Sequence, residues 1–197
     1  MNPTTTSPDT RTPRRADAEL NDAKILDAAV ALAERQGSVP SISAVAREAR
    51  VGTTTIYRRF ESLRALRTRT SAVLVCNRLA PSMMAARADG RPMQAFRTLS
   101  LALITQVLAL PPEAVSLEDL MEEYLARFGT VIADVKASAQ RSGELRPDIT
   151  VDDIAGVTVA MLAGVIQARP WISSPERYVA LLFDGLSRTD APTLPPA

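Results

Sequence analysis

Apolar side chains recur along this chain at the three- and four-residue spacing of an α-helix. Over residues 19–36, Ile25, Ala29 and Leu32 fall on one face, and Gly37 supplies a stop. We find no strand-like alternation, so the pattern predicts an all-α protein. Read between proline and glycine positions, it predicts further helices over about 41–49, 53–60, 63–81, 93–110, 117–142, 151–168 and 175–186.

The extent of two of these helices stays open. We expect Pro81 to end or kink the fourth helix, because proline lacks the N–H that a helix interior needs. Gly129 leaves the stretch over 117–142 either continuous or broken. Both residues therefore mark points where the helical pattern alone does not fix the structure.

Composition favours helices and an intracellular setting. The 197 residues are 46% hydrophobic and only 4% aromatic, with alanine and leucine dominant, which suits one or two helical domains. No apolar run reaches the length of a membrane span and no signal-peptide pattern opens the chain, so we expect no membrane partner. The single cysteine, Cys76, forms no internal disulfide, which fits a reducing cytoplasm, and we expect it to be an inert core residue.

The two ends of the chain are poor in large apolar side chains. Residues 1–18 are rich in Thr, Pro, Ser and Arg and predict a disordered basic tail. Its arginines could contact phosphates, and a solvated tail without a role is an equal alternative. Residues 191–197 are expected to be frayed.

Histidine is absent, which excludes Ser-His-Asp and Cys-His mechanisms and removes the commonest metal ligand. We therefore expect no catalytic residues, no metal and no cofactor. One alternative is a small helical enzyme that uses the carboxylates of Glu118, Asp119, Glu122 and Glu123, although no second cluster accompanies them. Another is a helical adaptor that binds protein and no DNA.

Residues 41–60 carry the clearest chemical pattern. A short amphipathic helix, a tight turn and a second short helix opening with three threonines have the layout of a helix-turn-helix, whose second helix enters the DNA major groove. Charge agrees with this interpretation. Residues 11–70 hold twelve Lys and Arg against seven Asp and Glu, an excess of +5, while the remainder has an excess of −4.

The residues at these positions resemble the tetracycline-repressor (TetR) family of transcriptional regulators. The resemblance runs from Ile25-Leu-Asp-Ala-Ala29 through Gly37, Val45-Ala46 and Val51 to Thr55-Ile-Tyr57 and Phe60, and returns at Gly143-Glu-Leu-Arg-Pro-Asp148. It implies a three-helix DNA-binding domain over 19–66 and a helical domain for ligand binding and dimerisation over 67–190.

The sequence departs from the family pattern at three positions. Arg50 stands where glycine is usual in the inter-helix turn, so we expect a strained or differently shaped turn. Gly52 replaces the serine that usually caps the recognition helix, and Leu63 replaces a lysine, whose phosphate contact Arg64 could supply.

The candidate DNA contacts cluster on the second helix. Free amides and threonine hydroxyls at its start can bind phosphate, and its arginines can reach phosphates or guanine edges. The resemblance implies that the Tyr57 hydroxyl meets phosphate, although its ring could instead join the core. Weaker candidates, which could equally be solvated, are Ser41, Arg47 and Arg64. Ser41 can also cap the helix that follows it. The predicted set is Ser41, Arg47, Thr53, Thr54, Thr55, Tyr57, Arg58, Arg59 and Arg64.

A single helix-turn-helix reads too few base pairs to find a genomic site, so we expect a homodimer on palindromic double-stranded DNA. The apolar stripes of the last two helices are the candidate interface, and intrachain core is the alternative for about half of these side chains. The predicted interface is Ile154, Val157, Thr158, Met161, Val165, Tyr178, Leu182 and Phe183.

The resemblance also implies that the middle helices enclose a cavity for a small-molecule effector. The apolar and methionine side chains there favour a hydrophobic molecule, and ordinary core packing is the alternative. The predicted lining is Met84, Phe96, Leu99, Leu103, Val107, Met121, Tyr124, Phe128 and Met161. We expect a repressor that its effector releases, because effector binding would shift the fourth helix and lower the affinity for DNA. Activation of transcription is the alternative.

Overall fold

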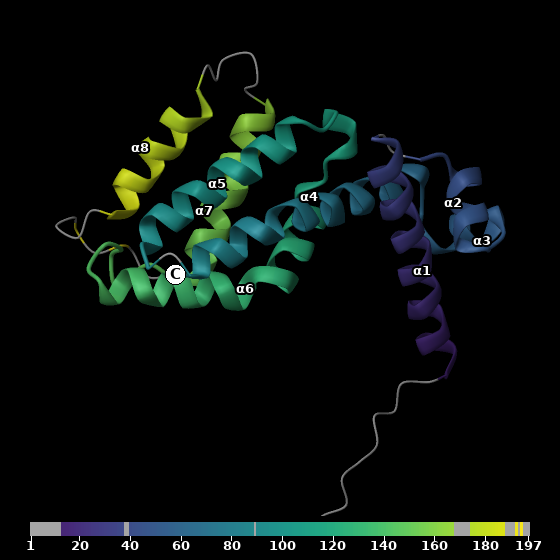
Figure 1. Cartoon of the computed structure of the whole chain (residues 1–197), viewed down its shortest axis with the longest axis horizontal. Coiled ribbons are helices and arrows are strands. Elements are labelled where there is room, and N and C mark those ends of the chain that lie inside the picture. Colours follow the sequence, from purple (N-terminus) through teal and green to yellow (C-terminus); the bar gives the residue numbers. More distant parts are fainter. Residues whose placement is uncertain are drawn as a thin grey trace, which may run out of the picture. The chain divides into compact units, whose positions relative to one another are not determined.

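The chain forms α-helices joined by short turns, as Figure 1 shows for the computed structural model. The structure describes residues 13–37, 40–88, 90–167, 174–187, 192 and 194, with side chains from residue 20 onward. Within these ranges there is no β-strand, which confirms the all-α class. Contacts divide the chain into an N-terminal unit, Met1–Leu66, and a C-terminal unit, Arg67–Ala197.

The N-terminal unit is a small bundle around one apolar core. It contains α1 (Pro13–Gln36), α2 (Ile42–Ala49), α3 (Thr53–Arg59) and the first residues of α4 (Leu63–Ala88). Its core joins Ile25 of α1, Val45 of α2 and Ile56 of α3, all buried, and Phe60 and Leu66 close it. Each of these helices therefore depends on the others for the burial of its apolar face.

The first helix begins earlier than predicted. It starts at Pro13 rather than Glu19, so the predicted disordered tail is wrong for residues 13–18. Proline suits the first turn of a helix, where its missing N–H has no partner to lose and its fixed φ is already helical. The rest of the predicted tail, residues 1–12, lies outside the described residues. The stop at Gly37 is confirmed, because Gly37 adopts φ 66° and its N–H donates to the carbonyl of Ala33 at 2.9 Å.

The helices of the C-terminal unit follow the predicted boundaries within a few residues. After α4 come α5 (Pro92–Leu108), the 3₁₀ turn η1 (Pro112–Ala114), α6 (Leu117–Arg141), α7 (Val151–Gln167) and α8 (Pro175–Ser187). The helix α6 runs unbroken through Gly129.

Pro81 does not end α4, which corrects the first of the two outcomes expected for it. The helix continues to Ala88 with the proline inside it. Leu79 and Met83 lie on either side of Pro81, and both are buried in the same core cluster. Their packing holds the chain helical across the proline and outweighs the lost hydrogen bond.

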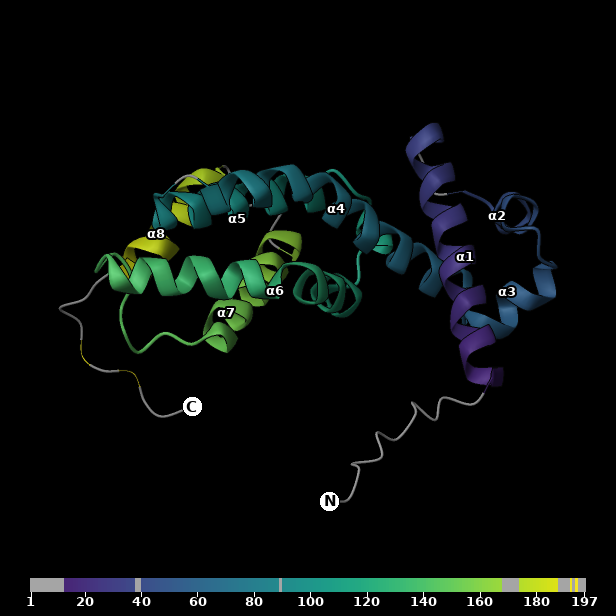
Figure 2. The same ribbon diagram turned by 60° about the horizontal axis from the view of Figure 1, so that its bottom comes forward.

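The core of the C-terminal unit is built around α5. This helix contacts α6, α7 and α8, and α4 contributes Val75, Leu79 and Met83 to the same core. Figures 1 and 2 show α6, α7 and α8 arranged around α5 within this unit. The space where α5, α6, α7 and α8 converge is therefore lined by segments far apart in the sequence.

The turn between α6 and α7 is tied to residues near the chain's end. The Arg146 guanidinium donates to both carboxylate oxygens of Asp148, at 2.9 and 2.7 Å, and to the carbonyl of Pro192 at 2.7 Å. The N–H of Leu194 donates to Asp148 Oδ2 at 2.9 Å. These bonds differ from the predicted fraying at Pro192 and Leu194; the remainder of 191–197 lies outside the described residues. The hydrogen bonds from Arg146 and Leu194 lower the pKa of the Asp148 carboxyl.

Candidate DNA-binding surface and effector cavity

The helix α2 is fixed at its start by a side-chain cap and at its sides by the core. Ser41 is the N-cap with φ −71° and ψ 153°, and its Oγ accepts from the N–H of Ala44 at 3.3 Å. Ile42 and Val45 face inward. The predicted cap is therefore confirmed, and the Ser41 hydroxyl already has a partner within the protein.

The turn between α2 and α3 carries the strain expected from Arg50. This residue adopts the left-handed conformation, φ 55° and ψ 43°, and its N–H points to the carbonyls of Ala46 and Arg47. For a residue with a Cβ, that conformation costs about 1–2 kcal/mol. Gly52 then caps α3 with φ −72° and ψ 147° and offers no side-chain hydrogen bond. The first amides of α3 are therefore left without a side-chain cap at Gly52.

The helix α3 has one fully buried residue on its inner side and several exposed residues on its outer side. Ile56 is 1% exposed and packs into the core of the N-terminal unit. Thr53, Thr54 and Arg58 are exposed, and the side chain of Tyr57 is 58% exposed, so its ring faces away from the core. Four of the predicted DNA contacts therefore lie on one accessible stretch of helix.

Arg59 has a different environment from its neighbour Arg58. Its Nε lies 3.5 Å from Asp22 Oδ1 of α1, and the side chain is only partly exposed. Both atoms are buried and form no hydrogen bond with good geometry. The ion pair therefore links the end of α3 to α1, a positioning role that the spacing of the sequence did not indicate.

The weaker DNA candidates lie around α3 on neighbouring segments. Arg47 on α2 and Arg64 at the start of α4 are exposed. Thr55 is partly buried, and its N–H donates to the carbonyl of Gly52 at 2.9 Å. Ser62, which the sequence reading passed over, caps α4 by accepting from the N–H of Ala65 at 3.0 Å. Ser62 directly precedes Leu63, the first residue of α4, and a serine at that position is a common N-cap that the sequence could have shown.

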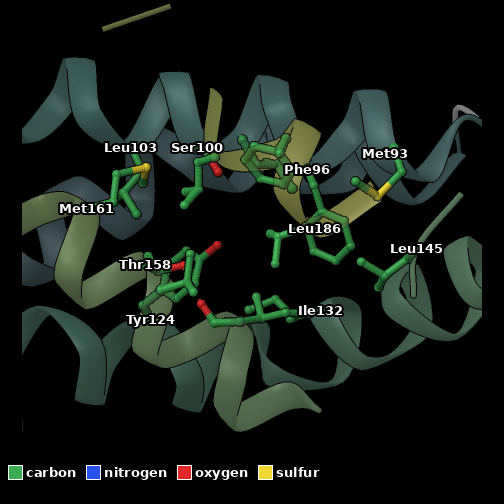
Figure 3. Close-up of a pocket in the computed structure, with 15 residues that line it drawn as sticks. Met93, Phe96, Ser100, Leu103, Tyr124, Ile132, Leu145, Thr158, Met161 and Leu186 are labelled. Atoms are coloured by element: carbon green, nitrogen blue, oxygen red, sulfur yellow. Dashed lines mark hydrogen bonds between the residues drawn. The ribbon is translucent and has the colours of Figure 1, made fainter. Parts of the chain in front are cut away.

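A cavity of about 30 Å³ lies between α5, α6, α7 and α8 in the C-terminal unit. That volume holds about two water molecules. Figure 3 shows side chains from all four helices converging on it. Its lining is Met93, Phe96, Leu99, Ser100, Leu103, Tyr124, Ile132, Leu145, Ile154, Val157, Thr158, Met161, Leu182, Phe183 and Leu186.

The predicted effector residues divide into three groups. Phe96, Leu99, Leu103, Tyr124 and Met161 line the cavity. A second group, Val107, Met121 and Phe128, is buried in the surrounding core without lining it. Met84 is 69% exposed on α4, away from the cavity, because it falls on the outer face of the helix beside the buried Met83.

The predicted dimer residues also divide between core and surface. Met161, Val165 and Phe183 are buried within the single chain. The cavity lining includes Ile154, Val157, Thr158, Met161, Leu182 and Phe183. Single-helix periodicity could not separate a stripe that faces a neighbouring helix from one that faces a second copy.

Tyr178 and Leu181 of α8 remain on the surface of the single chain. Leu181 is 65% exposed, and Tyr178 is also exposed. The Tyr178 hydroxyl lies against α7 at Gly164, where an added Cβ would approach it to 3.3 Å. A contact between α7 and α8 at this point therefore depends on the small size of glycine.

Two buried groups have raised pKa values. Burial raises the pKa of the Cys76 thiol to about 12, and it likewise raises the pKa of the Tyr124 phenol to about 12. Both side chains are therefore neutral at physiological pH. For Cys76, this agrees with an inert core residue, because the thiolate is the reactive form.

The carboxylates considered for enzyme chemistry are spread along α6. Glu122 pairs with Arg69 at 3.4 Å, and Glu123 with Arg127 at 3.6 Å. Across the described ranges, no group of three or more histidine, cysteine or acidic side chains is placed to hold a metal ion. No helix within those ranges combines the length and apolar character that crossing a bilayer requires.

The sequence of the N-terminal unit matches a known family. Residues 25–69 match the profile of bacterial regulatory proteins, tetR family, which confirms the resemblance found in the sequence. No curated protein matches the chain. Similar solved structures include a TetR transcription regulatory protein from Mycobacterium vanbaalenii, 27% identical over 89% of this chain and 99% of that one, with a TM-score of 0.40. Another is a TetR transcriptional regulator from Streptomyces coelicolor, 28% identical over 85% and 98%, with a TM-score of 0.43. The likeness of this chain to the family is carried by residues 25–69.

Proposed function

We propose that this protein, whose residues 25–69 belong to the tetR family of bacterial regulatory proteins, is a homodimeric repressor released by a small apolar effector. Its operator would be palindromic DNA. The observation that carries the proposal is the outward face of α3. Thr53, Thr54, Tyr57 and Arg58 are all exposed on a helix that Ile56 anchors from behind. Such a helix can enter a major groove without disturbing its own core.

The chemistry of that face suits DNA. Threonine hydroxyls can donate to or accept from phosphates and base edges, and arginine contacts phosphate or guanine. The exposed ring of Tyr57 places its hydroxyl outside the core, where it can donate a hydrogen bond to a phosphate oxygen. No side chain caps α3 at Gly52, so phosphate oxygens can accept from its first amides.

Dimerisation is supported by surface that one copy leaves exposed. Leu181 and Tyr178 of α8 are exposed, and the small residues Gly156 and Ala160 of α7 are exposed as well. Burying such a face in a two-fold interface would stabilise the pair and place two α3 helices on one duplex.

Effector release is supported by the cavity and by the course of α4. The cavity lies in the same core cluster as Leu79 and Met83 of α4. The helix α4 is continuous from Leu63, beside the core of the N-terminal unit, to Ala88 in the C-terminal unit. A ligand that displaces the shared core would move α4 and change how the two α3 helices fit the duplex. By linkage, operator DNA would weaken effector binding to the same extent.

The decisive experiment is selection of bound sequences from random duplex DNA by the purified full-length protein. We expect a two-fold symmetric motif whose half-sites lie about one helical turn apart. Affinity for the selected duplex should fall steeply as salt rises from about 50 to 200 mM, because phosphate contacts release counterions. Recovery of no motif, with salt-independent binding, would contradict the proposal and favour the protein-binding adaptor.

A further inference from the structure

The cavity between α5, α6, α7 and α8 is lined without a charged side chain. Its walls are aliphatic, aromatic and methionine side chains, interrupted by three hydroxyl groups on Ser100, Tyr124 and Thr158. An ionised group placed there would lose its hydration and meet no opposite charge, which is strongly unfavourable. The lining therefore discriminates against anions and cations.

The three hydroxyl groups come from three different helices. Ser100 lies on α5, Tyr124 on α6 and Thr158 on α7, and Figure 3 draws them toward the same side of the cavity, with Met93 and Leu145 toward the other. They form the polar end of an otherwise apolar space.

The hydrogen bonds of these groups leave donors and an acceptor available. The Thr158 hydroxyl donates to the carbonyl of Ile154 at 2.7 Å, so its oxygen remains free to accept. Among the described residues, neither the Ser100 nor the Tyr124 hydroxyl has a protein partner. Tyr124 is 8% exposed as a residue and lines the cavity, so its hydroxyl can donate to an acceptor placed there.

The shape of the cavity limits the ligand to a slender molecule. Met93 and Ser100 are seven residues apart on α5, which separates the apolar and polar ends by about 10 Å. The free volume of about 30 Å³ is small, so a ligand must displace side chains. Met93 and Met161 are unbranched and can adapt to a chain that enters between them.

A wider groove adjoins the cavity and offers a route to it. Val157 and Leu186 line both spaces. The groove has a volume of about 450 Å³ and lies beside Gly156, Gly185 and Leu194 on the surface of the C-terminal unit. A slender molecule can therefore reach the apolar interior by displacing the side chains of Val157 and Leu186.

We propose that the cavity binds an uncharged, slender molecule with one hydroxyl or carbonyl group, whose oxygen accepts a hydrogen bond from the Tyr124 hydroxyl beside Ser100 and Thr158. The regulatory meaning of this site rests on the proposed function, whereas the ligand chemistry rests on the lining alone. Tyr124 recognises the oxygen of the ligand through a hydrogen bond, and the uncharged lining of the cavity excludes ionised analogues.

The test compares three ligands of one chain length. Binding of 1-octanol, octanoate and octylammonium to the full-length protein is measured by isothermal titration calorimetry at pH 7. We expect 1-octanol to bind at least about tenfold more tightly than either ion, because each ion would enter without a partner. Equal or tighter binding of octanoate or octylammonium, or no binding of 1-octanol, would overturn the inference.

Tyr124→Phe removes the hydroxyl and keeps the ring. It should weaken 1-octanol binding about fivefold, the effect of one hydrogen bond, and leave the thermal unfolding midpoint nearly unchanged. Thr105→Val, which removes a hydroxyl from an exposed residue of α5 outside the cavity, is the control and should leave 1-octanol affinity unaltered. An unchanged affinity in Tyr124→Phe would remove Tyr124 from the assigned role.

A DNA-release measurement separates this inference from the proposed function. If 1-octanol binds as expected and leaves the affinity for the selected duplex unchanged, the cavity chemistry stands and effector-controlled repression is wrong. If octanoate or octylammonium binds best and releases DNA, effector control stands and the inference is wrong.

Discussion

The candidate functional residues are exposed on the outward face of α3 and buried in the cavity of the C-terminal unit. On α3, one buried residue, Ile56, holds the helix while its functional candidates project into solvent. In the cavity, the candidates themselves are buried, and their neighbours come from four helices. A recognition surface can therefore be changed without altering its support, whereas each change in the cavity also alters packing.

The largest effect is expected from removing the buried side chain that supports α3. Ile56→Ala should destabilise the N-terminal unit by about 3 kcal/mol, because it removes a fully buried side chain and leaves a cavity. DNA binding should be lost with the fold of that unit, while 1-octanol binding in the C-terminal unit persists. Differential scanning calorimetry and titration with 1-octanol check both parts. Loss of 1-octanol binding as well would mean that the two units unfold together.

The next change alters the surface of α3 and spares its support. Replacing both Tyr57 and Arg58 by alanine should lower DNA affinity by about 100-fold, since each side chain is exposed and available for phosphate or base contacts. The thermal midpoint and the dimer should be unchanged. Fluorescence anisotropy with the selected duplex, at fixed salt, measures the affinity.

Arg141→Ala is the matched control, an exposed arginine at the end of α6 in the other unit. It should reduce DNA affinity by less than about twofold, because it lies outside the proposed DNA-binding surface. Normal binding by the Tyr57 and Arg58 double variant would contradict the assignment of this surface.

The sequence predicted the buried and exposed faces of α3 better than the lining of the cavity, for a physical reason. Thr53, Ile56 and Tyr57 lie within one turn and a half of one helix, so spacing alone assigns them to the inner or outer face. The cavity depends on which stripe of each helix meets which neighbour. Periodicity identified Thr158 and Phe183 as apolar-face residues but could not show that they line the cavity.

Interactions between helices explain the other differences. The pairing of Arg59 with Asp22 joins residues on α3 and α1, and no local pattern announces it. Likewise, α4 continues through Pro81 because Leu79 and Met83 are both packed, a tertiary effect that outweighs local preference. By contrast, the capping of α2 by Ser41 is local and was predicted correctly.

A smaller effect is expected from a change that tests whether Arg59 contacts DNA or holds α3 in place. Asp22→Asn removes the charge beside Arg59 and should cost less than about 1 kcal/mol of stability, because the two atoms form no hydrogen bond and the rest of both side chains is partly exposed. The freed guanidinium should increase DNA affinity a few-fold and steepen the salt dependence by about one counterion. Binding measured across a salt series tests this, with Asp27→Asn, an exposed aspartate on the same helix, as the control. A fall in affinity would show that Arg59 acts by holding α3 in place.

The smallest expected effect concerns the turn that joins α2 to α3. Arg50→Gly should stabilise the N-terminal unit by about 0.5–1 kcal/mol, because glycine adopts the left-handed conformation without strain, although it also gains entropy in the unfolded chain. Arg47→Gly, inside α2, is the contrasting variant and should destabilise the unit by about 1 kcal/mol, since it places glycine in a helix interior. Thermal unfolding of both variants measures the difference. If Arg50→Gly lowers stability, then the arginine side chain stabilises this turn by more than its backbone strain, and the turn belongs with the anchoring residues rather than with the replaceable surface.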